Sequence, residues 1–288
     1  MSWFLFAFLT ALFRSLTDVA GKFGLKNMDE YIVAWSLFLF ALPFMGLLLL
    51  FKGVPQIGDD FWIALLVSGT ANIATNLLYM RAIKVSDLSI TIPLITFTPL
   101  FMLITSPLIL GEFPDLFGLA GIVLIVGGSY ILNFKESSKG YLAPFRALVR
   151  EKGPRLMLLV AFIWSITANL DKVGIENSSV FFWPVAVNSF IALGFIPVVM
   201  LRSRGKTRQI TSNLRTLVPI GLFHGMMIIT QMVAVSLTLV AYVISIKRTS
   251  AAISVVLGSL VFKESGLRDR LTGSIIMIAG VVLITVFS

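Results

Sequence analysis

The 288-residue chain has no cysteine and a single histidine, His224, and charged residues make up only 13% of it. Soluble domains carry about 25% charged residues, so a water-soluble globular protein is excluded. The missing cysteines exclude a disulfide-rich scaffold, and with His224 standing alone we expect neither a metal site nor a bound cofactor. The residues are instead 57% hydrophobic, which is typical of a polytopic membrane protein.

The sequence also lacks the motifs of an intramembrane enzyme or an ATP-driven pump. Catalysis would need a nucleophile with its base, a carboxylate pair or a metal motif such as HExxH, and none is found. A primary pump would need a GxxxxGK[ST] phosphate loop, which is absent too. We therefore expect neither of these two classes.

Ten apolar segments are long enough to cross a bilayer core of about 30 Å, which takes about 20 helical residues. They predict an all-α polytopic membrane protein with ten transmembrane helices and short connections. The longest connection, residues 135–155, is basic and weakly amphipathic, and it predicts a linker with a short interfacial helix. The expected spans are 3–25, 31–51, 61–82, 88–110, 116–134, 156–175, 180–201, 217–236, 239–262 and 271–287.

The two halves of the chain repeat each other. Several residues of the first half recur 150 or 152 residues later, among them Ser15, Lys22, Gly24, Gly69, Met80, Glu112, Gly121 and Gly128. Each half has five spans, an odd number, so the second copy must enter the membrane from the opposite side. We predict inverted five-helix repeats at 1–134 and 156–288, the architecture of alternating-access carriers.

In each repeat an apolar helix ends at a glutamate, Glu112 or Glu264, and a glycine-rich helix follows. These segments resemble the second part of an EamA-type repeat, and the resemblance covers essentially the whole chain. It implies the drug/metabolite transporter superfamily, with ten helices and secondary transport of small metabolites. It does not fix the substrate, because that superfamily moves amino acids, drugs, nucleotide sugars and phosphorylated sugars.

The basic residues indicate an orientation. Eighteen of the 23 Lys and Arg residues fall in or beside the odd-numbered connections, and only Lys52 and Lys172 fall in the even-numbered ones. By the positive-inside rule the odd connections face the cytoplasm and both termini lie outside. The family resemblance instead favours cytoplasmic termini. We follow the charge count.

Three basic residues, Arg14, Lys247 and Arg248, lie near the middle of spans, where a charge costs about 2.5–3.5 kcal/mol. Asp18, one helical turn beyond Arg14, can pair with it or act with it as a gate. The remaining pair, Lys247 and Arg248, predicts an anionic ligand with a phosphate or carboxylate group. The alternative is that the two side chains reach an aqueous vestibule or close against Asp18.

The segment around Lys247 and Arg248 resembles the ninth helix of sugar-phosphate/phosphate translocators, whose Lys-Arg pair binds phosphate. Those translocators also carry a lysine in the fourth helix, four residues before a proline. Here the proline is Pro99 and Ile95 occupies that place. The third cationic contact is therefore missing, and a carboxylate or a phosphodiester fits as well as a sugar phosphate.

Further polar residues within the spans are candidates to line a central cavity. Asn72, Asn76 and Tyr79 form one stripe of the third span, because they are spaced i, i+4, i+7. The alternative is hydrogen bonding between helices, worth about 0.6 kcal/mol for each bond. The other candidates are His224, Gln231, Asn169, Asn188, Tyr242 and Ser245.

Together these features predict a secondary active transporter for a small anionic organic metabolite, working by alternating access and by exchange. Two alternatives stay open: an exporter of neutral or zwitterionic metabolites such as amino acids, and a flippase for a phosphorylated lipid headgroup. The expected partners are the small-molecule substrate and the lipid bilayer, with no nucleic acid. The expected location is the plasma or inner membrane, and both a monomer and a homodimer stay open.

Overall fold

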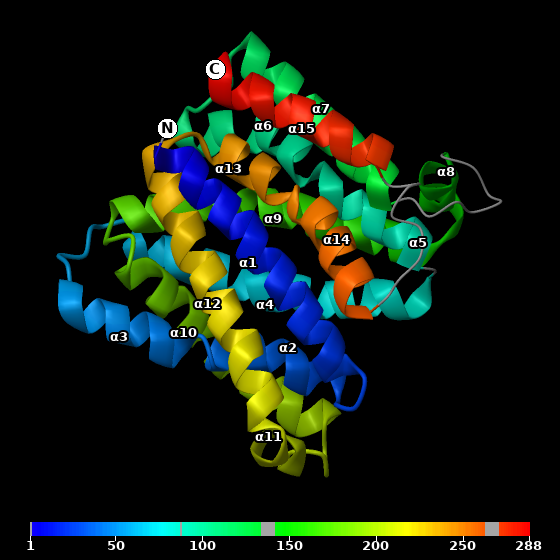
Figure 1. Cartoon of the computed structure of the whole chain (residues 1–288). Coiled ribbons are helices and arrows are strands. Elements are labelled where there is room, and N and C mark those ends of the chain that lie inside the picture. Colours follow the sequence, from blue (N-terminus) through cyan, green and yellow to red (C-terminus); the bar gives the residue numbers. More distant parts are fainter. Residues whose placement is uncertain (1, 87, 134–141, 263–270) are drawn as a thin grey trace. The chain divides into compact units, whose positions relative to one another are not determined.

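The computed structural model describes residues 2–86, 88–133, 142–262 and 271–288, and every regular element in these ranges is a helix (Figure 1). Lys263, Glu264, Arg268, Arg270 and the first part of the predicted linker, through residue 141, lie outside the described residues. The elements are α1 (Ser2–Leu25), α2 (Glu30–Leu39), α3 (Leu42–Lys52), α4 (Phe61–Val85), α5 (Leu88–Thr91), η1 (Ile92–Phe97), α6 (Thr98–Leu110), α7 (Leu116–Asn133), α8 (Ala143–Arg150), α9 (Lys152–Glu176), α10 (Phe182–Arg202), α11 (Arg208–Ser212), α12 (Leu214–Leu237), α13 (Val240–Lys247), α14 (Ser250–Phe262) and α15 (Leu271–Val286).

The predicted all-helical membrane fold is confirmed. Within the described residues, eight helical segments are long and apolar enough to cross a bilayer, and the shorter apolar helices α7 and α15 stand at the two remaining predicted spans. Three of the predicted spans are each built from more than one helix. These are the second (α2 and α3), the fourth (α5, η1 and α6) and the ninth (α13 and α14).

The helices group into two compact units. Among the described residues, unit 1 comprises those of 74–169 and 238–288, and unit 2 comprises residues 2–73 and 170–237. The division falls within α4 and within α9. Each unit takes helices from both halves of the chain, so the units of packing differ from the sequence repeats, whose boundaries stay a prediction.

In unit 1, α7 and α15 lie side by side (Figure 1) because glycines remove the side chains between them. A Cβ added to Gly128 would lie 2.6 Å from the carbonyl oxygen of Gly273, and one added to Gly280 would lie 2.6 Å from that of Gly121. Small residues at such crossings let two backbones approach closely in a membrane. The glycines that repeat between the halves therefore allow the backbones of this helix pair to pack closely.

In unit 2, α1 packs along α12 (Figure 1), and the Thr10 hydroxyl donates a hydrogen bond to the Thr230 hydroxyl at 3.0 Å. The bend between α2 and α3 also contacts α12. A Cβ added to Gly221 of α12 would lie 2.4 Å from the Cβ of Phe40 at this bend. Gly221 thus gives the irregular second span room to cross α12.

Candidate functional site

The ninth span is interrupted at its two adjacent cations. Helix α13 ends at Lys247, and α14 begins at Ser250. Between them the hydrogen bonds become those of a 3₁₀ turn: Arg248 N–H donates to Ser245 O and Thr249 N–H to Ile246 O, both at 2.9 Å. Lys247 and Arg248 are half-buried at this point.

The fourth span is interrupted at the matching place, which is the 3₁₀ helix η1 (Ile92–Phe97). Pro93 and Pro99 explain this irregularity, since proline removes a backbone donor. Ile95 in η1 lies 152 residues before Lys247. The ninth span has no proline and is interrupted as well.

The two interruptions are joined by a hydrogen bond. The Arg248 guanidinium donates to the Thr98 hydroxyl at 2.8 Å, and that hydroxyl donates to Ile95 O at 2.8 Å. Thr98 is buried at the start of α6. The contact ties the Arg248 side chain to the fourth span. Thr98 was not predicted, and its one sequence signal is a hydroxyl directly before Pro99.

A negative charge lies at the N-terminal end of α13 and a positive charge at its C-terminal end. The Glu112 carboxylate accepts a hydrogen bond from Val240 N–H at 3.1 Å, at the positive end of the helix dipole. Lys247 lies in the last turn, at the negative end. The helix therefore stabilises both charges, and the sequence has no acidic residue from Val240 to Phe262. Glu112, known from the sequence only as a repeated position, acts as a cap of the ninth span.

Aromatic rings pack near the interruption of the fourth span. Tyr79 of α4 stacks on Trp164 of α9 with ring centroids 6.1 Å apart, and the Trp164 indole N–H donates to the Thr75 hydroxyl at 3.1 Å. Both rings pack on the same buried apolar cluster as Ile95 and Phe97 of η1. Tyr79 is thus placed beside the interrupted segment, whereas Trp164 was not predicted.

Asn169 makes hydrogen bonds between helices, which is the alternative to lining a cavity. It is fully buried, its Oδ1 accepts from the Ser106 hydroxyl at 2.8 Å, and its Nδ2 donates to Thr105 Oγ1 at 3.0 Å. Nδ2 also donates to Ser165 O at 2.9 Å. These bonds tie α9 to α6 inside unit 1.

Tyr242 and Ser245 also have local partners. The Ser245 hydroxyl donates to Ala241 O at 2.7 Å. The Tyr242 hydroxyl lies 2.5 Å from the Ser288 hydroxyl and 3.4 Å from Asp115 Oδ1. Tyr242 itself precedes Lys247 by five residues, about 7.5 Å along the helix axis. Hydrogen bonds from Gly118 N–H and the Ser288 hydroxyl hold the pKa of Asp115 below its usual value. Tyr242 therefore lies near the N-terminal end of α13, where its hydroxyl bonds to Ser288 and Asp115.

The predicted ion pair of α1 is present in unit 2. Arg14 Nε lies 3.1 Å from Asp18 Oδ1, with side chains 39% and 42% exposed. In the same unit, His224 of α12 is buried, and its ring meets Phe38 edge-on at 5.3 Å. Gln231 is buried on the same helix.

Two further predicted candidates of unit 2 are amides that bond within their own helices. Asn72 Nδ2 donates to Ser68 O at 2.9 Å, and Asn188 Nδ2 donates to Pro184 O at 2.8 Å. Asn188 is buried, and its Oδ1 has no hydrogen-bond partner among the described residues. Asn76 is half-buried on the part of α4 that belongs to unit 1.

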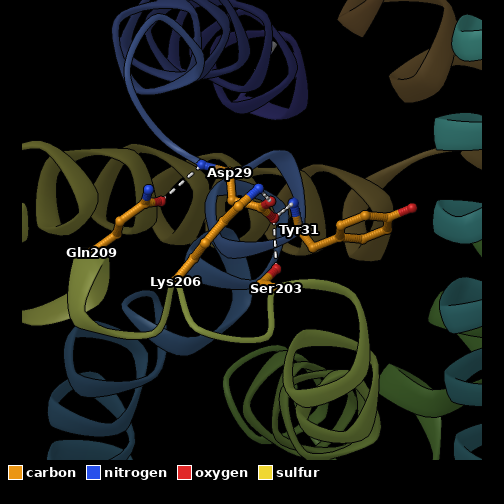
Figure 2. A network of polar contacts seen from close by, with 5 residues as sticks. All are labelled: Asp29, Tyr31, Ser203, Lys206 and Gln209. Carbon is orange, nitrogen blue, oxygen red and sulfur yellow. Dashed lines mark hydrogen bonds and ion pairs between the residues drawn. The ribbon is translucent and has the colours of Figure 1, made fainter.

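Figure 2 shows a polar network in unit 2 that the sequence did not predict. The half-buried Asp29 carboxylate caps α2 by accepting from Tyr31 N–H at 3.0 Å, and it also accepts from the Ser203 hydroxyl at 2.6 Å and from Lys206 Nζ at 2.9 Å. The Asp29 N–H donates to Gln209 Oε1 at 3.0 Å. Burial by itself would raise the Asp29 pKa, but these hydrogen bonds outweigh it and lower the pKa. Asp29 thus connects two odd-numbered connections.

Among the residues that the structure describes, no three His, Asp or Glu side chains are grouped so that they would hold a metal ion.

Comparison with known proteins identifies the family. The EamA-like transporter family matches residues 1–134 and 152–286, which is nearly the whole chain. The chain belongs to this family. An uncharacterized transporter in the cobO 3′ region of Sinorhizobium sp. is 28% identical over 135 residues, 46% of this chain and 96% of that protein. A solved structure described only as the crystal structure of a protein superimposes with a TM-score of 0.79 at 13% identity, covering 99% of this chain and 97% of its own, and shows the same fold.

This EamA-like transporter is therefore a multi-pass integral membrane protein that carries a small molecule across a lipid bilayer. The family matches both halves of the chain, as expected for two EamA repeats. The resemblance seen in the sequence at Glu112 and Glu264 is confirmed at the level of the family. The family does not specify the substrate, the coupling or the mechanism.

Proposed function

We propose that this EamA-like transporter carries a small organic anion bearing a phosphate or carboxylate group, and that Lys247 and Arg248 bind that group. The observation that carries the proposal is the pair of adjacent, half-buried cations at the interruption of the ninth span, with Arg248 hydrogen-bonded to Thr98. Interrupted membrane helices of this kind commonly form the binding sites of carriers.

The chemistry of the two side chains favours an anion. Arginine presents a planar fork that suits carboxylate and phosphate, and lysine adds a mobile point charge. The bond to Thr98 holds the fork in one orientation, which lowers the entropy lost when the ligand binds. The end of the α13 dipole stabilises one cation by about 0.3–1 kcal/mol, which is less than the cost of two charges at membrane depth. A bound anion adds favourable interactions with both cations.

Alternating access with exchange is the mechanism that we propose. The fourth and ninth spans are interrupted at matching residues in one unit, so each has a place where its two parts can change direction. Asn76 and Tyr79, which belong to the same unit as the two cations, are proposed to contribute to substrate binding. The roles of Asn72, His224, Gln231 and Asn188 in binding, and of Arg14 with Asp18 as a gate, stay predictions from the sequence. Asn169, Tyr242 and Ser245 act structurally in this proposal.

A ligand screen on the purified full chain tests the proposal. The apparent melting temperature is measured with a panel of phosphorylated sugars, carboxylates, amino acids and a soluble phosphorylated lipid headgroup. We expect at least one phosphate or carboxylate anion to raise it, because binding to the folded state stabilises that state. The shift should disappear in Lys247→Gln and Arg248→Gln and persist in Arg204→Gln, whose arginine is exposed in the connection after α10.

Other outcomes would overturn the proposal. A shift produced by neutral compounds and left unchanged in Lys247→Gln and Arg248→Gln would favour an exporter of neutral metabolites. If only zwitterionic amino acids gave a shift, and both variants lost it, the two cations would bind a carboxylate within a zwitterion, and the net anionic substrate class would be wrong. If only the lipid headgroup gave a shift, the flippase would replace the exchanger.

A further inference from the structure

The short helix α8 (Ala143–Arg150) has two exposed surfaces of different chemistry. Leu142, Phe145 and Val149 are 60%, 41% and 78% exposed and follow one another at helical spacing. Arg146 and Arg150 are exposed one turn apart beside them. An apolar stripe flanked by basic residues is typical of a helix that lies in the membrane interface.

The remaining face of α8 is packed on unit 1. Ala143 and Ala147 are buried, and Leu148 packs on the apolar cluster that also holds Ile95 and Phe97. The Arg155 guanidinium donates to Leu148 O at 2.7 Å and also to Val149 O. These bonds satisfy carbonyls at the C-terminal end of α8. The helix is therefore fixed through Ala143, Ala147 and Leu148. The side chains left most open are those of Leu142, Val149, Arg146 and Arg150.

Phe145 connects α8 to the interruption of the fourth span. Its ring meets the Phe97 ring at 90° with centroids 5.7 Å apart, and it also lies 5.7 Å from the Tyr130 ring. Phe97 is the last residue of η1 and directly precedes Thr98, the partner of Arg248. One side of Phe145 is thus packed on the interrupted span, and part of the ring stays exposed.

We propose that α8 is a docking surface for the anionic phospholipid headgroups of the bilayer, and that its docking restrains η1 through Phe145. The bilayer is the expected partner because α8 lies in the connection between two membrane spans, α7 and α9. It begins ten residues after the last residue of α7 and ends two residues before α9 begins. Arg146, Arg150 and the exposed Lys152 complement an anionic surface. The apolar stripe complements the acyl boundary beneath the headgroups.

The missing cysteines allow a clean labelling experiment. The full-length Val149→Cys variant carries an environment-sensitive dye and is reconstituted in vesicles of phosphatidylcholine, with or without phosphatidylglycerol. We expect the dye emission to shift to shorter wavelength with phosphatidylglycerol. In Arg146→Gln/Arg150→Gln it should fall back to the value in phosphatidylcholine alone. The matched control Arg204→Gln/Arg208→Gln removes two exposed arginines elsewhere and should keep the shift.

Hydrogen–deuterium exchange of residues 88–97 in the same vesicles tests the link to η1. Exchange should slow with phosphatidylglycerol in the unmodified chain but not in Arg146→Gln/Arg150→Gln or in Phe145→Ala. Dye emission that does not respond to phosphatidylglycerol, or that inorganic phosphate shifts equally in neutral vesicles, would overturn the docking surface. Unchanged exchange beside a shifted dye would overturn the restraint on η1. Neither readout depends on transport, so failure here is distinct from failure of the proposed anion site.

Discussion

At the residue scale, a charged side chain within a membrane span is stabilised by the group that it contacts. Arg14 has Asp18 at 3.1 Å on its own helix, and this pair follows from spacing alone. Arg248 has Thr98, 150 residues away in the chain. Only folding brings that pair together, so the sequence could nominate Arg248 but not its partner.

The Asp29 network gives a pH-dependent prediction at this scale. A carboxyl group whose pKa in the folded chain lies below its ordinary value of 3.8 stabilises the fold fully above that value. The contribution is lost as the pH falls through the lowered pKa. Asp29→Ala should therefore lower the apparent melting temperature at neutral pH, by the equivalent of about 1–2 kcal/mol, because it removes a helix cap and partly buried hydrogen bonds.

Thermal unfolding of the purified full chain at several pH values checks this prediction. Asp59→Ala, which removes an exposed carboxylate from another connection, serves as the control and should have little effect. The difference between the unmodified chain and Asp29→Ala should narrow only below about pH 4, the region of the ordinary pKa of 3.8. A difference that stays constant down to the most acidic pH would contradict the role of the ionised carboxylate.

At the element scale, helix position was predictable and helix continuity was not. Hydropathy averaged over about 20 residues places all ten spans to within a few residues, because burial in lipid needs apolar length more than any individual residue. Pro93 and Pro99 account for the interruption of the fourth span. Arg248 and Thr249 carry no comparable signal, and the ninth span is nevertheless interrupted at them.

The close packing of α7 and α15 gives a prediction with a control on the neighbouring residue. A methyl group at Gly128 would lie 2.6 Å from the carbonyl oxygen of Gly273, whereas one at Gly127 meets nothing within 4 Å. Gly128→Ala should destabilise the fold by about 1–3 kcal/mol, since the backbones must separate. Gly127→Ala should be neutral or stabilising by up to about 1 kcal/mol.

Apparent melting temperatures of the two purified variants, measured in parallel, check the helix contact. A larger loss for Gly127→Ala than for Gly128→Ala would mean that α7 and α15 do not cross at these glycines.

At the scale of the whole molecule, the net charge is +9, and most of the 23 basic residues behind it indicate the orientation of the chain in the membrane. Only Lys247 and Arg248 are proposed to bind the ligand. The basic residues of the odd connections predict that these face the cytoplasm. Among the described residues, Asp29 and Lys206 join two of those connections at 2.9 Å, as two segments on one side of the membrane can do.

Single cysteines in this cysteine-free chain test the orientation. A membrane-impermeant maleimide should label Asp59→Cys, in an even connection, on intact cells. Arg204→Cys, in an odd connection, should react only after the membrane is permeabilised. Labelling in the opposite order would place both termini in the cytoplasm, as the family resemblance favours.

The measurement that tests the central claim most directly is exchange of a labelled anion by the chain in proteoliposomes, with the anion that stabilises it most in the ligand screen. We predict that Lys247→Gln and Arg248→Gln each reduce exchange at least tenfold, since each removes a charged contact worth about 1.5–3 kcal/mol. Thr98→Val should weaken apparent affinity for the anion, and Arg204→Gln should exchange like the unmodified chain. Exchange undiminished in both Lys247→Gln and Arg248→Gln would contradict the account.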